Sequence, residues 1–173
     1  MKPSRRRFLT GSLLLPLAGC GFQPVYMPTA SGKPGPAARE LAAVSVRLIP
    51  ERAGQVMREA LQERFGDDSG TPARYDLTVG LTISGEPIAI LPDTDPTRVR
   101  VTGRATYVLV TRASPPVQLT TGSARAIDNF NITHDQYFAA DLDNQSASRR
   151  VIQLMADQIA GQLAMYFRKQ AGT

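Results

Sequence analysis

The ten residues YDLTVGLTIS, at positions 75–84, alternate between apolar and polar side chains with a period of two. In an extended chain such a period places the apolar set on one face and the polar set on the other. The pattern predicts an antiparallel strand at 75–83 that is half-buried, with its polar face in water. The apolar set is Tyr75, Leu77, Val79, Leu81 and Ile83, and the polar set includes Asp76, Thr78, Thr82 and Ser84.

Two further long strands are predicted downstream, at 97–112 and 117–130, and the three strands together predict a meander. The connecting segments LPDTDP (91–96) and ASPP (113–116) have the Pro, Asp and Ser content of turns. A shorter strand is predicted at 43–49, where valine and leucine alternate with polar residues.

Two segments have the periodicity of amphipathic helices. Residues 53–65 carry apolar side chains at helical spacing and are followed by Gly66, a favourable C-terminal stop. Near the end of the chain an apolar stripe runs from Val151 to Phe167, and two basic residues follow at the negative end of the helix dipole. The start of this last helix stays open, since Ser146, Ser148 or an earlier residue such as Thr133 could cap it.

The order strand, helix, three strands, helix predicts an α+β fold. We expect a four-stranded, mainly antiparallel sheet with two helices packed on one face, which leaves the other face polar. This single domain is predicted to cover residues 41–170. Residues 20–40 are predicted to form a lipidated N-terminus and flexible tether, because 27–38 are rich in Pro, Gly, Ser and Ala.

Residues 1–19 are predicted to be a lipoprotein signal peptide. A basic start and an apolar run at 8–17, too short for the roughly 20 residues that span a bilayer, lead into Leu17-Ala18-Gly19-Cys20. This order resembles the bacterial lipobox, which implies cleavage before Cys20 and covalent lipid on its thiol and new N-terminus. The alternative is a free thiol after an ordinary signal peptide. The segment 4–9 also resembles a twin-arginine export signal, although the general secretory route is the simpler interpretation.

Composition argues against several classes of function. Removal of residues 1–19 lowers the formal charge from +5 to +1, so the basic pI gives no reason to expect nucleic acid as a partner. Cys20 is the only cysteine and His134 the only histidine, which leaves no nitrogen and sulfur ligand set for zinc. No phosphate-binding loop or serine elbow is present. We therefore expect no metal, no cofactor other than the lipid on Cys20, and no enzymatic activity.

CGFQPVY at 20–26, the order of elements, and the terminal segments LMADQI (154–159) and LAMYFRK (163–169) together resemble the LptE family of lipopolysaccharide-assembly lipoproteins. The resemblance covers essentially the whole mature chain. It implies a non-enzymatic plug inside the outer-membrane β-barrel LptD, which supports barrel assembly, binds lipopolysaccharide and helps to deliver it to the outer leaflet. Gly21 after the cysteine, rather than Asp, resembles lipoproteins anchored at the periplasmic side of the outer membrane. The alternatives are an auxiliary lipoprotein of a periplasmic lipid or solute transport system and a lipid-anchored enzyme.

Arginines gather on the predicted polar face of the sheet. If Arg112 lies opposite Val117, Arg104 lies directly across from Arg125, and like charges in that position are destabilising. Phosphate groups would neutralise them, so we hypothesise that lipopolysaccharide binds at Arg98, Arg100, Arg104 and Arg125. The alternative is a solvated strand face, partly neutralised by Glu86 or by acidic groups of a barrel lumen. Among the N-terminal aromatics, Phe22 is predicted to lie near the membrane, and Tyr26 to pack on the domain.

Overall fold

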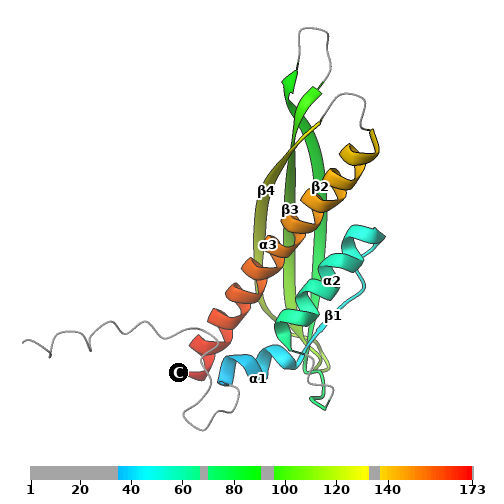
Figure 1. The fold of residues 1–173 in the computed structure, drawn as a ribbon. Helices are drawn as coiled ribbons and strands as arrows, with labels where there is room; N and C mark the ends of the chain where they lie inside the picture. The colour runs from blue at the N-terminus through cyan, green and yellow to red at the C-terminus, as the bar shows by residue number, and fades with distance from the viewer. Residues whose placement is uncertain (1–34, 67–69, 91–95, 133–136, 173) are drawn as a thin grey trace, which may run out of the picture.

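The computed structural model describes residues 35–66, 70–90, 96–132 and 137–172. Its elements follow the order α1, β1, α2, β2, β3, β4, α3 (Figure 1). The predicted signal peptide, Cys20, Phe22 and Tyr26 lie outside the described residues, as does His134. The bounds of the elements are α1 Pro36–Ala42, β1 Val44–Val46, α2 Glu51–Phe65, β2 Tyr75–Ile90, β3 Pro96–Thr111, β4 Gln118–Asn131 and α3 Tyr137–Ala171.

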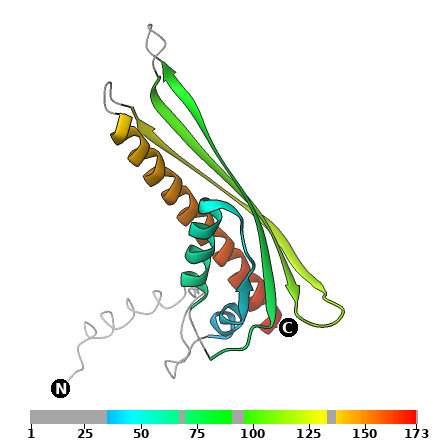
Figure 2. The same ribbon diagram turned by 90° about the vertical axis from the view of Figure 1, so that its right-hand side faces the viewer.

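The predicted α+β class and the four strands are confirmed, but the sheet is mixed and three helices accompany it. The strand order is β1-β2-β3-β4, with β1 parallel to β2 and the other neighbours antiparallel. The parallel pair arises because α2 connects β1 to β2, and a crossover helix returns the chain to the end from which it started. Figure 2 shows a long twisted sheet with the helices on one face.

Helix α1 is the element that the sequence analysis did not predict. It crosses the predicted boundary at residue 40/41, in a stretch whose Pro and Ala content resembles a tether. Ala37 and Leu41 are buried, and the helix packs against α3. Its Glu40 carboxylate accepts hydrogen bonds from Arg74 at 2.7 Å and from the Tyr75 hydroxyl at 2.8 Å. Burial opposes ionisation of Glu40, yet these hydrogen bonds and the charge of Arg74 outweigh it and lower the carboxyl pKa.

The end of α2 and the start of α3 test two predictions about where the helices stop and begin. Gly66 caps α2 with a φ of +84°, which glycine adopts without steric cost, so the predicted stop is confirmed. α3 begins at Tyr137, and the proposed caps Ser146 and Ser148 are therefore wrong because both lie inside the helix. The third candidate, Thr133, lies outside the described residues. No residue from Phe138 to Ser146 is buried, and the two large apolar residues of this part, Phe138 and Leu142, are exposed, so the first turns of α3 do not continue the buried stripe of the helix.

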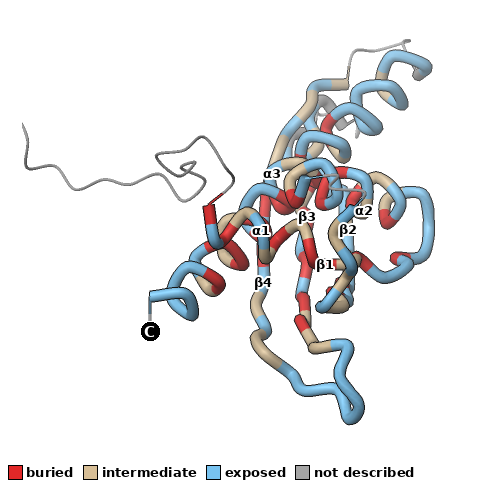
Figure 3. Tube along the Cα trace, turned by 90° about the horizontal axis from the view of Figure 1, so that it is seen from below, coloured by how far each residue is buried: buried red, intermediate tan, exposed pale blue. Residues whose placement is uncertain are grey.

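The core lies between the sheet and the helices, as the buried residues in Figure 3 show. Strand β3 supplies its central row, and α3 supplies the side chains that cover it. Across the helix layer, the Arg64 guanidinium of α2 bonds Asp157 at 2.6 Å and the Gln153 carbonyl at 3.3 Å. The largest side chains that are fully buried are Leu41, Met57, Leu61, Leu77, Leu109, Met155, Ile159, Leu163, Val101 and Val151.

Gly103 sets how closely α3 approaches β3. A Cβ atom at this position would overlap the Val151 side chain and would lie 2.6 Å from the Met155 methyl carbon. By contrast, a Cβ atom at Gly161, in the middle of α3, would meet no neighbouring atom within 4 Å. Gly103 is therefore required by packing, whereas Gly161 is only tolerated.

We predict that Gly103→Ala lowers the free energy of unfolding by about 1–3 kcal/mol, because the added methyl overpacks a closed interface. Gly161→Ala is the matched control, and it should raise stability by about 0.5–1 kcal/mol through helix propensity. Urea denaturation followed by circular dichroism measures both. Equal or greater stability of Gly103→Ala would contradict the close approach of α3 to β3.

Candidate functional site: the open face of the sheet

The sheet face that points away from the helices is mostly polar along the three long strands, although Ile127, which is 45% exposed, and the half-buried Val108 also lie on it. On β2 and β4 the exposed members of this face include Thr78, Thr82, Ser84, Thr121, Ser123 and Asn129. The side chains that cross-strand pairing brings to this face from β3 include Thr102, Arg104 and Thr106. None of the described helices covers this face (Figure 2). The predicted division into one apolar and one polar face is therefore present in the structure.

Arg104 and Arg125 are directly opposite each other, as the sequence analysis predicted. The assumed turn register is one residue off at its start, since the Thr111 N–H bonds the Val117 carbonyl at 2.9 Å. An irregularity between Leu109 and Val110 restores the predicted register along the rest of β4. The two guanidiniums thus extend from adjacent strands on the same exposed face.

The backbone hydrogen bonds show that Arg104 and Arg125 form a non-hydrogen-bonded pair, which is the more closely spaced of the two kinds of antiparallel pair. The Arg125 N–H donates to the Gln158 side-chain oxygen at 3.1 Å, and the Gln158 amide donates to the Arg125 carbonyl at 3.0 Å. Because both backbone groups of Arg125 point to α3, neither bonds Arg104. A pair without these bonds has Cα atoms about 4.5 Å apart, against about 5.5 Å in the bonded pair. Two positive side chains therefore start from adjacent backbone positions with no acidic residue between them.

The other predicted arginines lie farther along β3. Arg100 pairs with Asn129 on β4 and with Glu86 on β2, and Arg98 pairs with Asn131. Arg98, Arg100, Arg104 and Arg125 are all exposed, and none makes an ion pair with another part of the chain that the structure describes. The predicted neutralising partner Glu86 is thus placed beside Arg100 without a direct ion pair.

Arg112 differs from these four because its charge is already satisfied. Its guanidinium contacts the Asp76 carboxylate at 2.7 and 2.8 Å, and Arg47 lies 3.9 Å from the same carboxylate. The positive charge available to a ligand is therefore concentrated toward the half of β3 that precedes Ala105. The Arg104–Arg125 pair can hold a phosphate or carboxylate between two guanidinium groups, whose planar donors fit such oxygens.

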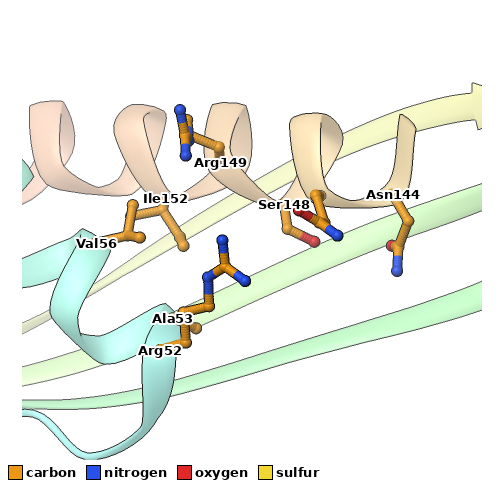
Figure 4. Close-up of a pocket in the computed structure, with 8 residues that line it drawn as sticks. Arg52, Ala53, Val56, Asn144, Ser148, Arg149 and Ile152 are labelled. Atoms are coloured by element: carbon orange, nitrogen blue, oxygen red, sulfur yellow. The ribbon is translucent and has the colours of Figure 1, made fainter. Parts of the chain in front are cut away.

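A second feature, which the sequence analysis missed, is a groove of about 280 Å³ between α2 and α3 (Figure 4). Arg52 from α2 and Arg149 from α3 border it, and its apolar lining includes Val56 and Ile152. The volume is slightly below the roughly 300–1,000 Å³ of typical ligand sites. The apolar periodicity of the sequence predicts that each helix forms, but it does not show which turns of α2 and α3 face each other, and the groove depends on that placement.

The described residues contain no group of three or more His, Cys, Asp or Glu side chains that could hold a metal ion. The buried Tyr107 hydroxyl, whose pKa is raised by burial, donates to the Gln162 side chain at 2.9 Å and so has a structural partner. None of the helices in the described ranges has the length and apolar character needed to cross a membrane.

Comparison with known proteins identifies relatives of this fold. The family model LptE, lipopolysaccharide-assembly, matches residues 41–165. A protein from Caulobacter crescentus CB15 that is assigned as a lipoprotein has a similar crystal structure. Its TM-score is 0.63 at 21% identity, over 78% of this chain and 98% of that one. Rare lipoprotein B from Shewanella oneidensis gives a TM-score of 0.55 at 9% identity, over 74% of this chain and 96% of that one. None of the curated proteins matches at a significant level.

Proposed function

This chain belongs to the LptE family of lipopolysaccharide-assembly proteins, and from that premise we propose that it is a non-enzymatic subunit of the outer-membrane lipopolysaccharide translocon. In this proposal, lipid on Cys20 anchors the chain at the periplasmic side of the outer membrane. The domain plugs an LptD-type β-barrel, supports assembly of that barrel, and assists delivery of lipopolysaccharide to the outer leaflet. It needs no cofactor beyond the covalent lipid.

The observation that carries the proposal is the open polar face of the sheet. A plug must bury a large surface inside a barrel whose interior is polar and wet. A face made mostly of threonine, serine and arginine side chains would leave little apolar surface in the water of such a lumen, whereas an apolar face would leave much more. The lipobox-like sequence before Cys20 supports membrane attachment, because covalently bound acyl chains contribute about 0.8 kcal/mol per buried CH₂.

Four arginines, Arg98, Arg100, Arg104 and Arg125, have no ion pair among the described residues, and this supports direct contact with lipopolysaccharide, whose lipid carries phosphate groups. A phosphate between Arg104 and Arg125 would remove the repulsion of two like charges on adjacent strands. Each contact would be a charge-assisted hydrogen bond, which is roughly twice as strong as a neutral one. The free energy needed to bring the two positive side chains close together is supplied when the domain folds, before a ligand binds, because Gln158 fixes the backbone of Arg125.

We predict that the protein incorporates radiolabelled palmitate in growing cells and that Cys20→Ala abolishes the label, because Cys20 is the only thiol in the chain. Membrane fractionation of both forms is the companion measurement. Label that persists in Cys20→Ala, or wild-type protein that stays unlabelled, would contradict lipidation at this residue.

We predict that purification of the tagged full-length lipoprotein from detergent-solubilised membranes recovers a large, heat-modifiable β-barrel in a fixed ratio. Mass spectrometry and electrophoresis with and without heating identify it. Recovery of an inner-membrane transporter in its place would favour the alternative, an auxiliary lipoprotein of a periplasmic lipid or solute transport system.

We predict that the double variant Arg100→Glu with Arg104→Glu weakens binding of lipopolysaccharide roughly tenfold or more at low salt, and less as ionic strength rises, because exposed charges are screened. The control is Arg52→Glu with Arg149→Glu, which changes the net charge equally but alters the groove between α2 and α3. Fluorescence titration with labelled lipopolysaccharide measures both. Equal weakening by the two double variants would indicate a general charge effect and would contradict a site on the sheet.

A further inference from the structure

The two long edges of the sheet differ in whether side chains close them. In an antiparallel ladder, each residue of an edge strand points its N–H and C=O groups alternately toward its neighbour and outward. Outward groups that lack a partner are a template for pairing with another extended chain. On β4 the outward groups belong to the odd-numbered residues, since both backbone groups of Arg125 bond Gln158.

Helix α3 closes the middle of the β4 edge with two glutamines, one helical turn apart. Gln158 satisfies the N–H and C=O of Arg125, as a neighbouring strand would do. Gln162 donates to the Ser123 carbonyl at 3.0 Å, and Tyr107 holds its side-chain oxygen. The Asn129 N–H bonds the side chain of Asp128 at 2.8 Å, and Arg150 bonds the other oxygen of that carboxylate. Side chains therefore occupy the positions that an added strand would need.

The edge of β2 is closed only at its beginning. β1 pairs with Tyr75, Asp76 and Leu77, and the last hydrogen bond of the pair runs from the Arg47 N–H to the Leu77 carbonyl at 2.9 Å. By alternation, the outward groups of β2 are then those of Val79, Leu81, Ile83 and Gly85. Val79 is buried, whereas Leu81 and Ile83 are half-buried and Gly85 is exposed. Beyond Leu77, no described residue donates to or accepts from these outward groups.

The residues of this free edge also lack the charged side chains and prolines that usually keep an edge strand from pairing with another chain. The segment 78–84, TVGLTIS, has no charged residue and no proline, and β-branched residues make up four of its seven positions. Figure 2 shows β2 continuing well past the start of α2, so α2 does not lie alongside this part of the edge. Leu48, which follows the last β1–β2 hydrogen bond, is 78% exposed and provides apolar surface next to it.

We infer that the edge of β2 from Gly80 to Gly85 receives an extended segment of the barrel subunit as an added strand. The side chains of that segment alternate, with apolar residues on the helix side beside Leu81 and Ile83, and polar residues on the open face beside Thr82 and Ser84. This inference rests on the proposed function and names the surface through which the partner binds.

The occupant is a segment of a partner and not a second copy of this chain, because the window is small. β1 blocks the edge up to Leu77 and Pro87 ends it on the other side, so a symmetric pair would share at most the nine residues 78–86 a side. Stable interfaces use roughly 20–30 residues a side. A partner that already surrounds the domain supplies the remaining contacts and presents the segment at high local concentration.

Amide hydrogen exchange at single-residue resolution tests the inference, with the full-length lipoprotein alone and in complex with its co-purified barrel. In the free protein the amides of Leu81, Ile83 and Gly85 should exchange rapidly, while those of Thr82 and Ser84, bonded to β3, exchange slowly. In the complex the first three should slow by roughly tenfold or more. The Ile127 amide, outward on β4, should not change.

The matched variants are Ile83→Pro and Ile127→Pro. Each removes an outward N–H that no strand of this chain uses, on opposite edges of the sheet. Ile83→Pro should lower recovery of the barrel roughly tenfold, because the donor is lost and the proline ring obstructs pairing. Ile127→Pro should leave recovery unchanged. Thermal unfolding checks both variants, and if Ile83→Pro does not fold, the exchange data on the wild-type protein decide alone.

The outcomes separate the inference from the function on which it rests. If the barrel co-purifies but the amides of Leu81 and Ile83 exchange as in the free protein, strand addition is wrong and the plug remains. If no barrel co-purifies with the wild-type protein, both proposals fall. If these amides are protected in the free protein and light scattering shows a dimer, the occupant is a second copy and the inference is overturned.

Discussion

The packing of α3 against β3 and β4 is the constraint on which the rest of the structure depends. This helix of 35 residues is about 50 Å long and covers the two strands that hold the arginines. Its apolar stripe buries the row that includes Val101, Ala105 and Leu109, and Gly103 allows the close approach. Because one face of the sheet is committed to this contact, the even-numbered side chains of β3 from Arg98 onward are directed to the opposite, open face.

The same helix determines where charge can accumulate. α3 uses its polar flank to bind the β4 backbone, and in doing so it places Arg125 in a closely spaced pair with Arg104. Repulsion within such a pair costs stability unless water, salt or a ligand screens it. A fold selected for stability alone would gain from a polar uncharged residue at either position. The presence of two opposed arginines on the open face, while Arg112 has an acidic partner, is the reason to regard them as a site.

The strands and the pairing of the arginines could be predicted from the sequence because both depend on the alternation of apolar and polar side chains along each strand. The period of two in 75–84 determines which side chains share a face of the sheet. A turn at ASPP then brings Arg104 opposite Arg125. The assumed pairing next to the turn was wrong by one residue, but the irregularity between Leu109 and Val110 restores the predicted pairing farther along the strands. Helix α1 was missed because its stability comes from Leu41 and Ala37 packing on α3 and from the Glu40 contacts, which the composition of 36–42 does not reveal. The early start of α3 was missed because its first residues bury nothing.

Edges of a sheet are a further property that no linear pattern can show. TVGLTIS has the same appearance in a central strand as at an edge, and only the brevity of β1 makes most of it an edge. The glutamines at 158 and 162 likewise resemble ordinary polar positions of an amphipathic helix until their amides are found on the β4 backbone. The free edge of β2 and the closed edge of β4 are informative as a pair. Protection against aggregation alone would close both edges, whereas this domain closes one with side chains and leaves the other free. An asymmetry of this kind gives the domain one direction in which its sheet can be extended. That is a useful property for a subunit that must fit a single partner in a single orientation.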